Sequence, residues 1–459
     1  MSNQGNSDLK TCIFVLMMVI ETIFPLLVFL GIMVLISRGT FFKSSPFSSY
    51  SLQLAFGIKS MAGLVVFYLY SEYYPIRSEA DTFKYFDDSY YIAKAFWEHP
   101  IDYFQMLLGI DCNTEYFNTN YFNHMSNWVR SYDNGLFNDN RLIIRLNALF
   151  RVFSLGSYHV HSLFFNLIAF IGSLQLAKVF YAVSKSKLKS YLVVFLIPSV
   201  VFWSSGIFKE SILIYGLGTF LFHFYQLYIG NLSRRGILFL LFSSGVLVVM
   251  KLYVFAAFLP VCIVFYFTRN RKKIFLSYVL FFAFFLALGL GLDILAPRYS
   301  FIHLIVDKQR DFINLSKFFE VNSAFQMEYL QPTLFSLVKA APEALLNVFT
   351  KPWLGEVNGF LFVPPLVENL FVISLGFFCL IWRKKISDKE LKFVFLCLTF
   401  TFIVYIVIGL TTPITGALVR YKIPVMPFLW MALLILLDTQ KFPKGLRNHK
   451  TYQWLNSFL

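Results

Sequence analysis

The sequence is poor in charge and lacks the motifs of soluble nucleotide enzymes. Only 14% of its 459 residues are charged, whereas 58% are hydrophobic and 57 are Phe. This composition is too apolar for a soluble globular protein. The chain has no P-loop, no GxGxxG and no GxSxG motif, and no internal repeat is visible. Soluble nucleotide chemistry is therefore disfavoured.

Cysteine and histidine patterns are equally sparse. The chain has five cysteines without a CxxC spacing, and only Cys112 lies clearly outside the predicted helices. We therefore predict no disulfide framework. The pair His159 and His161 and the remaining histidines lack HxxxH or HExxH spacing. No metal ligand set is predicted from them.

What the sequence has instead is long apolar runs. A hydrocarbon core roughly 30 Å thick needs about 17 to 25 helical residues to cross it. The fold class predicted is all-α, a polytopic transmembrane helix bundle of about eleven spans with two large extracytoplasmic loops that contain interfacial helices. The predicted spans are 11–36, 51–71, 157–183, 190–206, 211–229, 236–251, 252–268, 274–294, 366–382, 393–411 and 422–438.

The basic residues predict the orientation. With 236–251 and 252–268 taken as two helices, the Lys/Arg-rich linkers, including RNRKK and RKKISDKELK, all fall on one face. The positive-inside rule makes this face cytoplasmic, with the C-terminus inside and the N-terminus outside. We predict a multi-pass protein of the bacterial inner membrane. The net charge of +15 then reflects topology and attraction to membrane lipids, with no nucleic acid as partner.

The predicted organisation follows from these spans. Two N-terminal transmembrane helices (1–71) precede an acidic extracytoplasmic loop with an interfacial helix (72–156). A six-helix membrane core (157–294), a second extracytoplasmic loop (295–365) and three further transmembrane helices (366–438) follow. A basic cytoplasmic tail (439–459) ends the chain. The first loop holds eleven of the 25 acidic residues, and the second is expected to form two or three helices broken at Pro332 and Pro342.

Candidate chemistry lies in the first loop. The segment DTFKYFDDSYYIAKAFWEHP has apolar residues at helical spacing, and it carries the adjacent carboxylates Asp87 and Asp88. Either aspartate could act as a general base toward an acceptor hydroxyl, or the pair could hold a divalent cation. Asp81 is a second candidate of the same kind. A solvated acidic face is the alternative.

Three further groups of residues are candidates for substrate binding. Lys209 and Glu210 lie in PSVVFWSSGIFKES, where an ionisable pair is costly unless it is paired or hydrated. Lys251 lies at the outer turn between two predicted spans, although it could instead extend toward the head groups. Arg420 and Tyr421 precede the last span on the outer side, where an arginine suits bidentate phosphate binding.

Together these residues resemble the GT-C superfamily of integral-membrane glycosyltransferases, in particular the group similar to family-39 mannosyltransferases. The resemblance rests on DDSYYIAKAF in the first outer loop, on the segment from RLIIRLNALF into the next span, and on VRYKIPVMPF before the closing span. The acidic loop here follows the second predicted span, whereas in many members it follows the first. The resemblance covers most of the membrane part loosely.

The resemblance implies transfer of a sugar from a polyprenyl-phosphate donor to an envelope glycan or lipid acceptor at the extracytoplasmic face. Asp87 or Asp88 would be the base, and Lys209, Lys251 and Arg420 would surround the donor phosphate. No cofactor is required, although the paired aspartates are compatible with a divalent cation. The alternatives are a polysaccharide polymerase or ligase, a lipid-linked glycan flippase or transporter, and a non-catalytic envelope scaffold.

Overall fold

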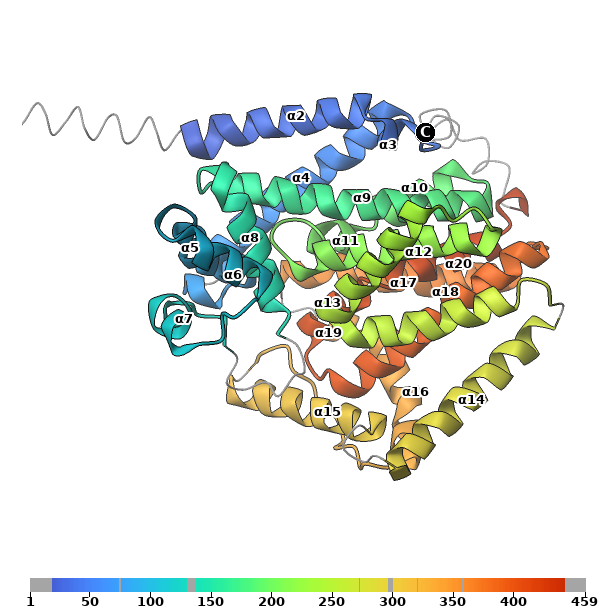
Figure 1. The fold of residues 1–459 in the computed structure, drawn as a ribbon. Coiled ribbons are helices and arrows are strands. Elements are labelled where there is room, and N and C mark those ends of the chain that lie inside the picture. The colour runs from blue at the N-terminus through green and yellow to red at the C-terminus, as the bar shows by residue number, and fades with distance from the viewer. Residues whose placement is uncertain are drawn as a thin grey trace, which may run out of the picture. The chain divides into compact units, whose positions relative to one another are not determined.

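The protein is built from helices throughout the part described by the computed structural model. The described residues are 19–73, 76–129, 138–271, 273–295, 300–319, 321–356 and 359–441, and every named element among them is a helix (Figure 1). Within these ranges, two isolated antiparallel β-bridges pair extended residues, Ala324↔Ile414 and Arg383↔Leu437. The predicted all-α class is therefore confirmed.

Eight of the described helices are long and apolar enough to cross a membrane, or nine if one bent pair counts as a span. This number supports a multi-pass membrane protein. The candidate spans are Val19–Arg38, Ser49–Glu72, Tyr158–Ser184, Lys209–Ile229, Arg234–Phe267, Ile274–Gly291, Phe360–Ile381 and Asp388–Thr411, with Thr415–Lys422 and Met426–Leu436 as the bent pair. The predicted number of eleven is not confirmed among the described residues.

The predicted span 190–206 accounts for part of the difference. In its place are two short helices, α10 (Lys187–Phe195) and α11 (Pro198–Trp203). Pro198 lacks an N–H and disfavours helical dihedrals in the residue before it, and here the helix is interrupted between Phe195 and Pro198. After α11 the chain turns at Gly206, whose φ of +79° lies in the left-handed region open to glycine.

The predicted spans 236–251 and 252–268 correspond to two helices that meet at a kink and together carry the label α13. Helix α13 runs from Arg234 to Phe267, and Lys251 has non-helical dihedrals of φ −150° and ψ 87° within it. The break lies at the boundary that the sequence predicts. At about 1.5 Å per residue, the 34 residues of α13 would exceed the hydrocarbon thickness as a straight rod.

The chain divides into two compact units. Unit 1 comprises Met1–Leu176, Val201–Phe220 and Leu238–Lys251, and unit 2 comprises Ala177–Val200, Leu221–Ile237 and Leu252–Leu459. The helices that lie wholly in unit 1 or begin in it are η1 (Val19–Ile23), α2 (Phe24–Arg38), α3 (Thr40–Lys43), α4 (Ser49–Tyr73), η2 (Arg77–Glu79), α5 (Asp81–Glu98), α6 (Pro100–Leu108), α7 (Glu115–Asn120), η3 (Phe122–His124), α8 (Asn140–Ser154), α9 (Tyr158–Ser184) and α12 (Lys209–Ile229).

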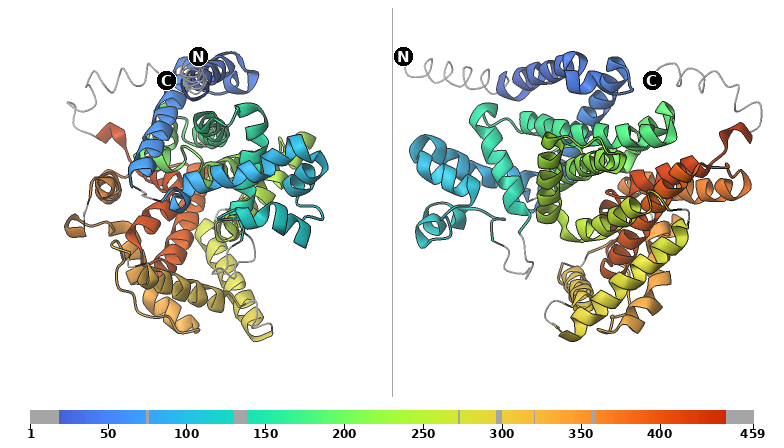
Figure 2. Two further views of the ribbon diagram at one scale, coloured as in Figure 1. Left: turned by 90° about the vertical axis from the view of Figure 1, so that its left-hand side faces the viewer. Right: turned by 45° about the vertical axis from the view of Figure 1, so that its right-hand side comes forward.

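In unit 1, the short helices of the first loop gather at the N-terminal end of α9. Helix α5 packs on α8 and α6, and Thr82 of α5 forms a hydrogen bond with Tyr158 of α9 (Figures 1 and 2). Phe83 and Phe86 of α5 are buried, whereas Trp97 is 76% exposed. The predicted helix of the first loop is thus present, with only part of its aromatic face covered.

Two glycines let α9 and α12 approach closely within unit 1. A Cβ on Gly218 would lie 1.9 Å from the carbonyl oxygen of Gly172, a distance that no real side chain tolerates. Only glycine, which has no side chain, fits at this helix crossing. The contact brings the first turns of α12 beside the core of unit 1.

Unit 2 contains the remaining helices, together with α10 and the second half of α13. Helix α18 packs against α15, α16 and α20, and α20 also packs against α10 and α17. Pro342 lies inside α16, so this helix continues through the predicted break. The further helices are α14 (Ile274–Leu295), α15 (Phe301–Phe318), α16 (Leu334–Thr350), η5 (Leu354–Glu356), η6 (Phe360–Phe362), α17 (Val363–Ile381), α18 (Asp388–Thr411), α19 (Thr415–Lys422), α20 (Met426–Leu436) and η7 (Thr439–Lys441).

Side-chain caps mark where several of these helices begin. Ser233 caps α13, Ser300 caps α15 and Thr333 caps α16. Ser387 and Glu390 form a reciprocal capping box at the start of α18. Each cap satisfies backbone N–H groups that have no partner within the first helical turn.

Candidate functional site

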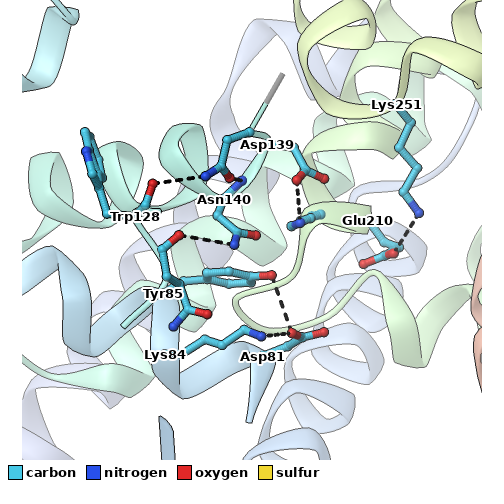
Figure 3. Close-up of polar contacts among 11 residues, drawn as sticks. Asp81, Lys84, Tyr85, Trp128, Asp139, Asn140, Glu210 and Lys251 are labelled. Carbon is cyan, nitrogen blue, oxygen red and sulfur yellow. Dashed lines mark hydrogen bonds and ion pairs between the residues drawn. The ribbon is translucent and has the colours of Figure 1, made fainter. Parts of the chain in front are cut away.

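The first part of the candidate site is the N-terminal turn of α5. Asp81 is the first residue of this helix, and its Oδ1 lies 2.7 Å from the Nζ of Lys84. The hydroxyl of Tyr85 donates to the same oxygen at 3.5 Å (Figure 3). The Asp81 side chain is 28% exposed, so the carboxylate is oriented by the two neighbours and still reaches solvent.

The second part is an ion pair between distant segments of unit 1. Lys209 begins α12, and its Nζ lies 2.7 Å from Oδ1 of Asp139, directly before α8. The two side chains are only 11% and 17% exposed. The Nζ of Lys209 is also 5.6 Å from the ring centroid of Tyr85. Tyr85 therefore contacts Asp81 through its hydroxyl and Lys209 through its ring.

The third part is a more deeply buried ion pair. The Nζ of Lys251 lies 3.3 Å from Oε1 of Glu210, with the two side chains 9% and 1% exposed (Figure 3). Lys251 is the residue at which the backbone of α13 leaves the helical region. Since a buried charge is costly without a partner, Glu210 and Lys251 depend on each other.

The turn before Lys209 is fixed by polar side chains of α4 and α9. The Nζ of the buried Lys59 donates to the carbonyl oxygen of Ser204 and to its Oγ, the latter at 2.6 Å. The N–H of Gly206 donates to Oδ1 of Asn166 at 2.8 Å, and Ser211 Oγ donates to the Ser204 carbonyl at 3.0 Å. These hydrogen bonds satisfy polar backbone groups of the irregular turn and hold the turn in one conformation.

Lys59 and Asn166 were not among the site residues predicted from the sequence. Lys59 did carry a signal, because it is a lysine inside the apolar run SLQLAFGIKSMAGLVVF. A charged residue within a candidate span is a functional or structural marker by default. Asn166 carries no such signal, since a single amide in α9 is unremarkable until its partner in the turn is known.

The structure places Asp87 and Asp88 outside this network. Asp87 forms a two-bond ion pair with Arg77, at 2.7 Å to Nε and 3.0 Å to Nη2, and both side chains are substantially exposed. Asp88 is 3% exposed and accepts the backbone N–H groups of Ser126 and Asn127 at 2.9 Å and 2.8 Å. Burial raises the pKa of Asp88, and these two N–H groups oppose the rise.

Arg420 and Tyr421 lie in unit 2, on the short helix α19. The ring of Tyr421 packs against Phe312, with the two centroids 6.1 Å apart. The neighbouring Lys422 is buried and donates to the carbonyl oxygen of Lys351 at 2.9 Å and to Oδ1 of Asn369 at 3.2 Å. The assignment of Arg420 and Tyr421 to a phosphate stays a prediction from the sequence.

Asp81, Lys209 and Asp139 of unit 1 are thus linked through Tyr85 and the Lys209–Asp139 ion pair, whereas Glu210 and Lys251 form a separate ion pair in the same unit. Asp81, Lys209, Glu210 and Lys251 were predicted, and Asp139 is added by the structure. Among the residues that the structure describes, no group of three or more His, Cys, Asp or Glu could hold a metal ion.

This arrangement combines a partly accessible carboxylate with buried cations on adjacent elements. A carboxylate can accept a proton, and ammonium groups in a poorly solvated site stabilise an anion more than they would in water. Comparison with family models, curated proteins and solved structures gives no match for this chain.

Proposed function

We propose that this protein is a membrane glycosyltransferase that transfers a sugar from a polyprenyl-phosphate carrier to a glycan or lipid acceptor. One observation carries the proposal. Asp81 and Lys209 come from different segments of unit 1 and both contact Tyr85, Asp81 at its hydroxyl and Lys209 at its ring, while Lys84 and Asp139 are their respective ion-pair partners. A base and a phosphate-binding cation are the groups that this reaction requires.

In the proposed reaction, the acceptor hydroxyl gives its proton to the carboxylate of Asp81. The acceptor oxygen forms a bond to the anomeric carbon of the sugar as the bond from that carbon to the phosphate oxygen breaks. The polyprenyl phosphate leaves with the bonding electron pair, and the ammonium of Lys209 stabilises its charge. No metal ion takes part in this scheme.

Asp81 suits the role of base better than Asp87 or Asp88. Both oxygens of Asp88 accept backbone N–H groups, and Asp87 is held by the guanidinium of Arg77. Asp81 is more accessible than Asp88, and unlike Asp87 it contacts the tyrosine whose ring Lys209 also contacts. The proposed base is therefore six residues before Asp87 and seven before Asp88, the two residues predicted from the sequence.

The proposal includes the location and orientation predicted from the basic linkers. The donor would be bound at the extracytoplasmic face of the bacterial inner membrane, with its prenyl tail in the lipid. Arg420 and Tyr421, which lie in unit 2, are candidate substrate-binding residues on the basis of the sequence alone. The N-terminus would be outside and the C-terminus cytoplasmic.

The test is transfer of labelled sugar from a total lipid extract in membranes that contain the wild type, Asp81→Asn or Arg420→Ala at equal expression. We expect Asp81→Asn to lose about 100-fold or more in rate. Asp307→Asn is the matched control, because Asp307 is a 66% exposed aspartate on α15. Full transfer by Asp81→Asn would overturn the assignment of the base.

A flippase for lipid-linked glycans is the second candidate, and the break in α13 favours it. Discontinuous helices with buried ionisable residues are typical of transporters, and Lys251 combines both features. Proteoliposomes with a fluorescent lipid-linked glycan separate the two functions. Movement of the label across the bilayer without a new glycosidic bond would favour the flippase and overturn the transferase.

A further inference from the structure

Unit 2 contains a cavity of about 520 Å³ with a strongly basic lining. Its polar lining comes from the start of α10, the link between α17 and α18, and the segment that follows α20. The polar residues that line it are Lys189, Lys384, Lys385, Asp438, Gln440 and Lys441. None of them belongs to the candidate site in unit 1.

Backbone hydrogen bonds hold the walls of this cavity in place. Two extended segments pair where Lys384 N–H donates to the Leu436 carbonyl and Asp438 N–H donates to the Trp382 carbonyl, both at 2.8 Å. The Nζ of Lys189 donates to the carbonyl oxygen of Leu434 at 2.6 Å. The link between α17 and α18 is therefore attached to the end of α20, and a lysine of α10 is fixed beside them.

The lining carries more positive than negative charge. Four lysines face a single carboxylate, Asp438, whose Oδ2 lies 3.8 Å from the Nζ of Lys441. Lys384 also pairs with Glu390 at 2.9 Å, outside the lining. Burial lowers the pKa of Lys189 and the neighbouring ammonium of Lys384 lowers it further, while the carboxylates of Glu390 and Asp438 oppose this. A bound anion would relieve this repulsion between ammonium groups.

The cavity lies where membrane-crossing helices end. Helix α17 ends at Ile381, α18 begins at Asp388 and α20 ends at Leu436. Each belongs to a candidate span or to the bent pair. The ends of such helices lie at the level of the lipid head groups, and basic pockets between them are suited to anionic head groups.

We propose that this cavity binds a phosphate group, and specifically the phosphate of an anionic phospholipid from the surrounding leaflet. The lipid phosphate would accept hydrogen bonds from the lysines while its acyl chains lie against the apolar helices. A bound lipid would connect the ends of α17, α18 and α20. This inference does not depend on the proposed glycosyltransferase activity.

The test uses the full chain in detergent micelles, with bound lipid counted by native mass spectrometry during titration with phosphatidylglycerol or phosphatidylcholine. We expect phosphatidylglycerol to bind in preference to phosphatidylcholine. Lys384→Gln/Lys385→Gln should weaken binding of phosphatidylglycerol by about tenfold or more, because two basic contacts are removed. The matched control is Lys308→Gln/Lys339→Gln, which changes two lysines of α15 and α16 and should bind as the wild type does.

A second variant covers the case in which the double variant misfolds. Lys385 is exposed, so Lys385→Glu should fold and still reduce binding of phosphatidylglycerol. Equal binding of phosphatidylglycerol by wild type, Lys384→Gln/Lys385→Gln and Lys385→Glu would overturn the proposal. Inorganic phosphate is titrated in parallel. If it binds and phosphatidylglycerol does not, the phosphate site stands and the lipid source is wrong.

Discussion

The Nζ of Lys209 lies 2.7 Å from Oδ1 of Asp139, although 70 positions separate them in the chain. This ion pair attaches the first residue of α12 to the turn that opens α8. Because both side chains are mostly buried, each charge relies on the other. The pair fixes the position of a cation beside Tyr85, and it makes the candidate site sensitive to changes far away in sequence.

We first predict that Lys209→Met and Asp139→Asn each destabilise the protein by about 3 kcal/mol, because each removes the ion-pair partner of a mostly buried charge. The double variant should lose less than the sum of the two. Thermal unfolding of the four proteins in detergent measures this coupling. Strict additivity would mean that the two side chains do not interact.

Second, Asp88→Asn should loosen the segment around Ser126 and Asn127. Asparagine keeps one acceptor oxygen but places an NH₂ group against a backbone N–H, so about 1 to 3 kcal/mol of local stability should be lost. Limited proteolysis of this segment should become faster. Asp87→Asn is the control, because its partner Arg77 is exposed and such pairs contribute about 1 kcal/mol or less. Equal proteolysis of the two variants would contradict the prediction.

Third, Gly218→Ala should prevent correct packing of α12 on α9. The added Cβ would lie 1.9 Å from the Gly172 carbonyl oxygen, and backbone cannot yield as a flexible side chain would. We expect little folded protein in size-exclusion chromatography. Gly245→Ala in α13 is the control, since a Cβ there meets nothing within 4 Å, and it should fold normally. A normal yield of Gly218→Ala would show that the crossing is looser than described.

Fourth, Lys59→Met should lower the melting temperature by several degrees. The substitution removes the ammonium that donates to the carbonyl and hydroxyl of Ser204, and hydrogen bonds from a charged donor contribute about 1.5 to 3 kcal/mol, while Ser211 Oγ still donates to that carbonyl. Lys43→Met is the control, because Lys43 is an exposed residue at the end of α3. Unchanged melting of Lys59→Met would remove Lys59 from the framework of the turn.

Local patterns in the sequence were sufficient to predict the helical class and part of the candidate site. Lys251 interrupts an apolar run, and the helix does break at that residue. Lys209 and Glu210 are adjacent charges beside an apolar segment, and both take part in buried ion pairs. In these cases the sequence alone is sufficient, because a charge among apolar neighbours costs free energy in any fold.

Long-range partners could not be predicted in the same way. Nothing near Asp139 indicates that it meets Lys209, and nothing near Asn166 indicates that it holds Gly206. Asp87 and Asp88 were predicted to form a site together because they are adjacent in sequence. Adjacent positions on a helix, however, point in different directions. The segment 190–206 was predicted as one span because its apolar composition outweighed Pro198, which in the structure lies at the break.

The division into two units constrains the order in which the protein can fold. The chain passes between them five times, and unit 1 requires residues up to Lys251. During synthesis, the partners of Asp139, Lys59 and Asn166 emerge only after most of unit 1 has already left the ribosome. The early helices must therefore remain incomplete until α12 and the first half of α13 arrive. Neither unit can be produced as one uninterrupted fragment, and truncations after α9 should be degraded rather than accumulate as a stable subdomain.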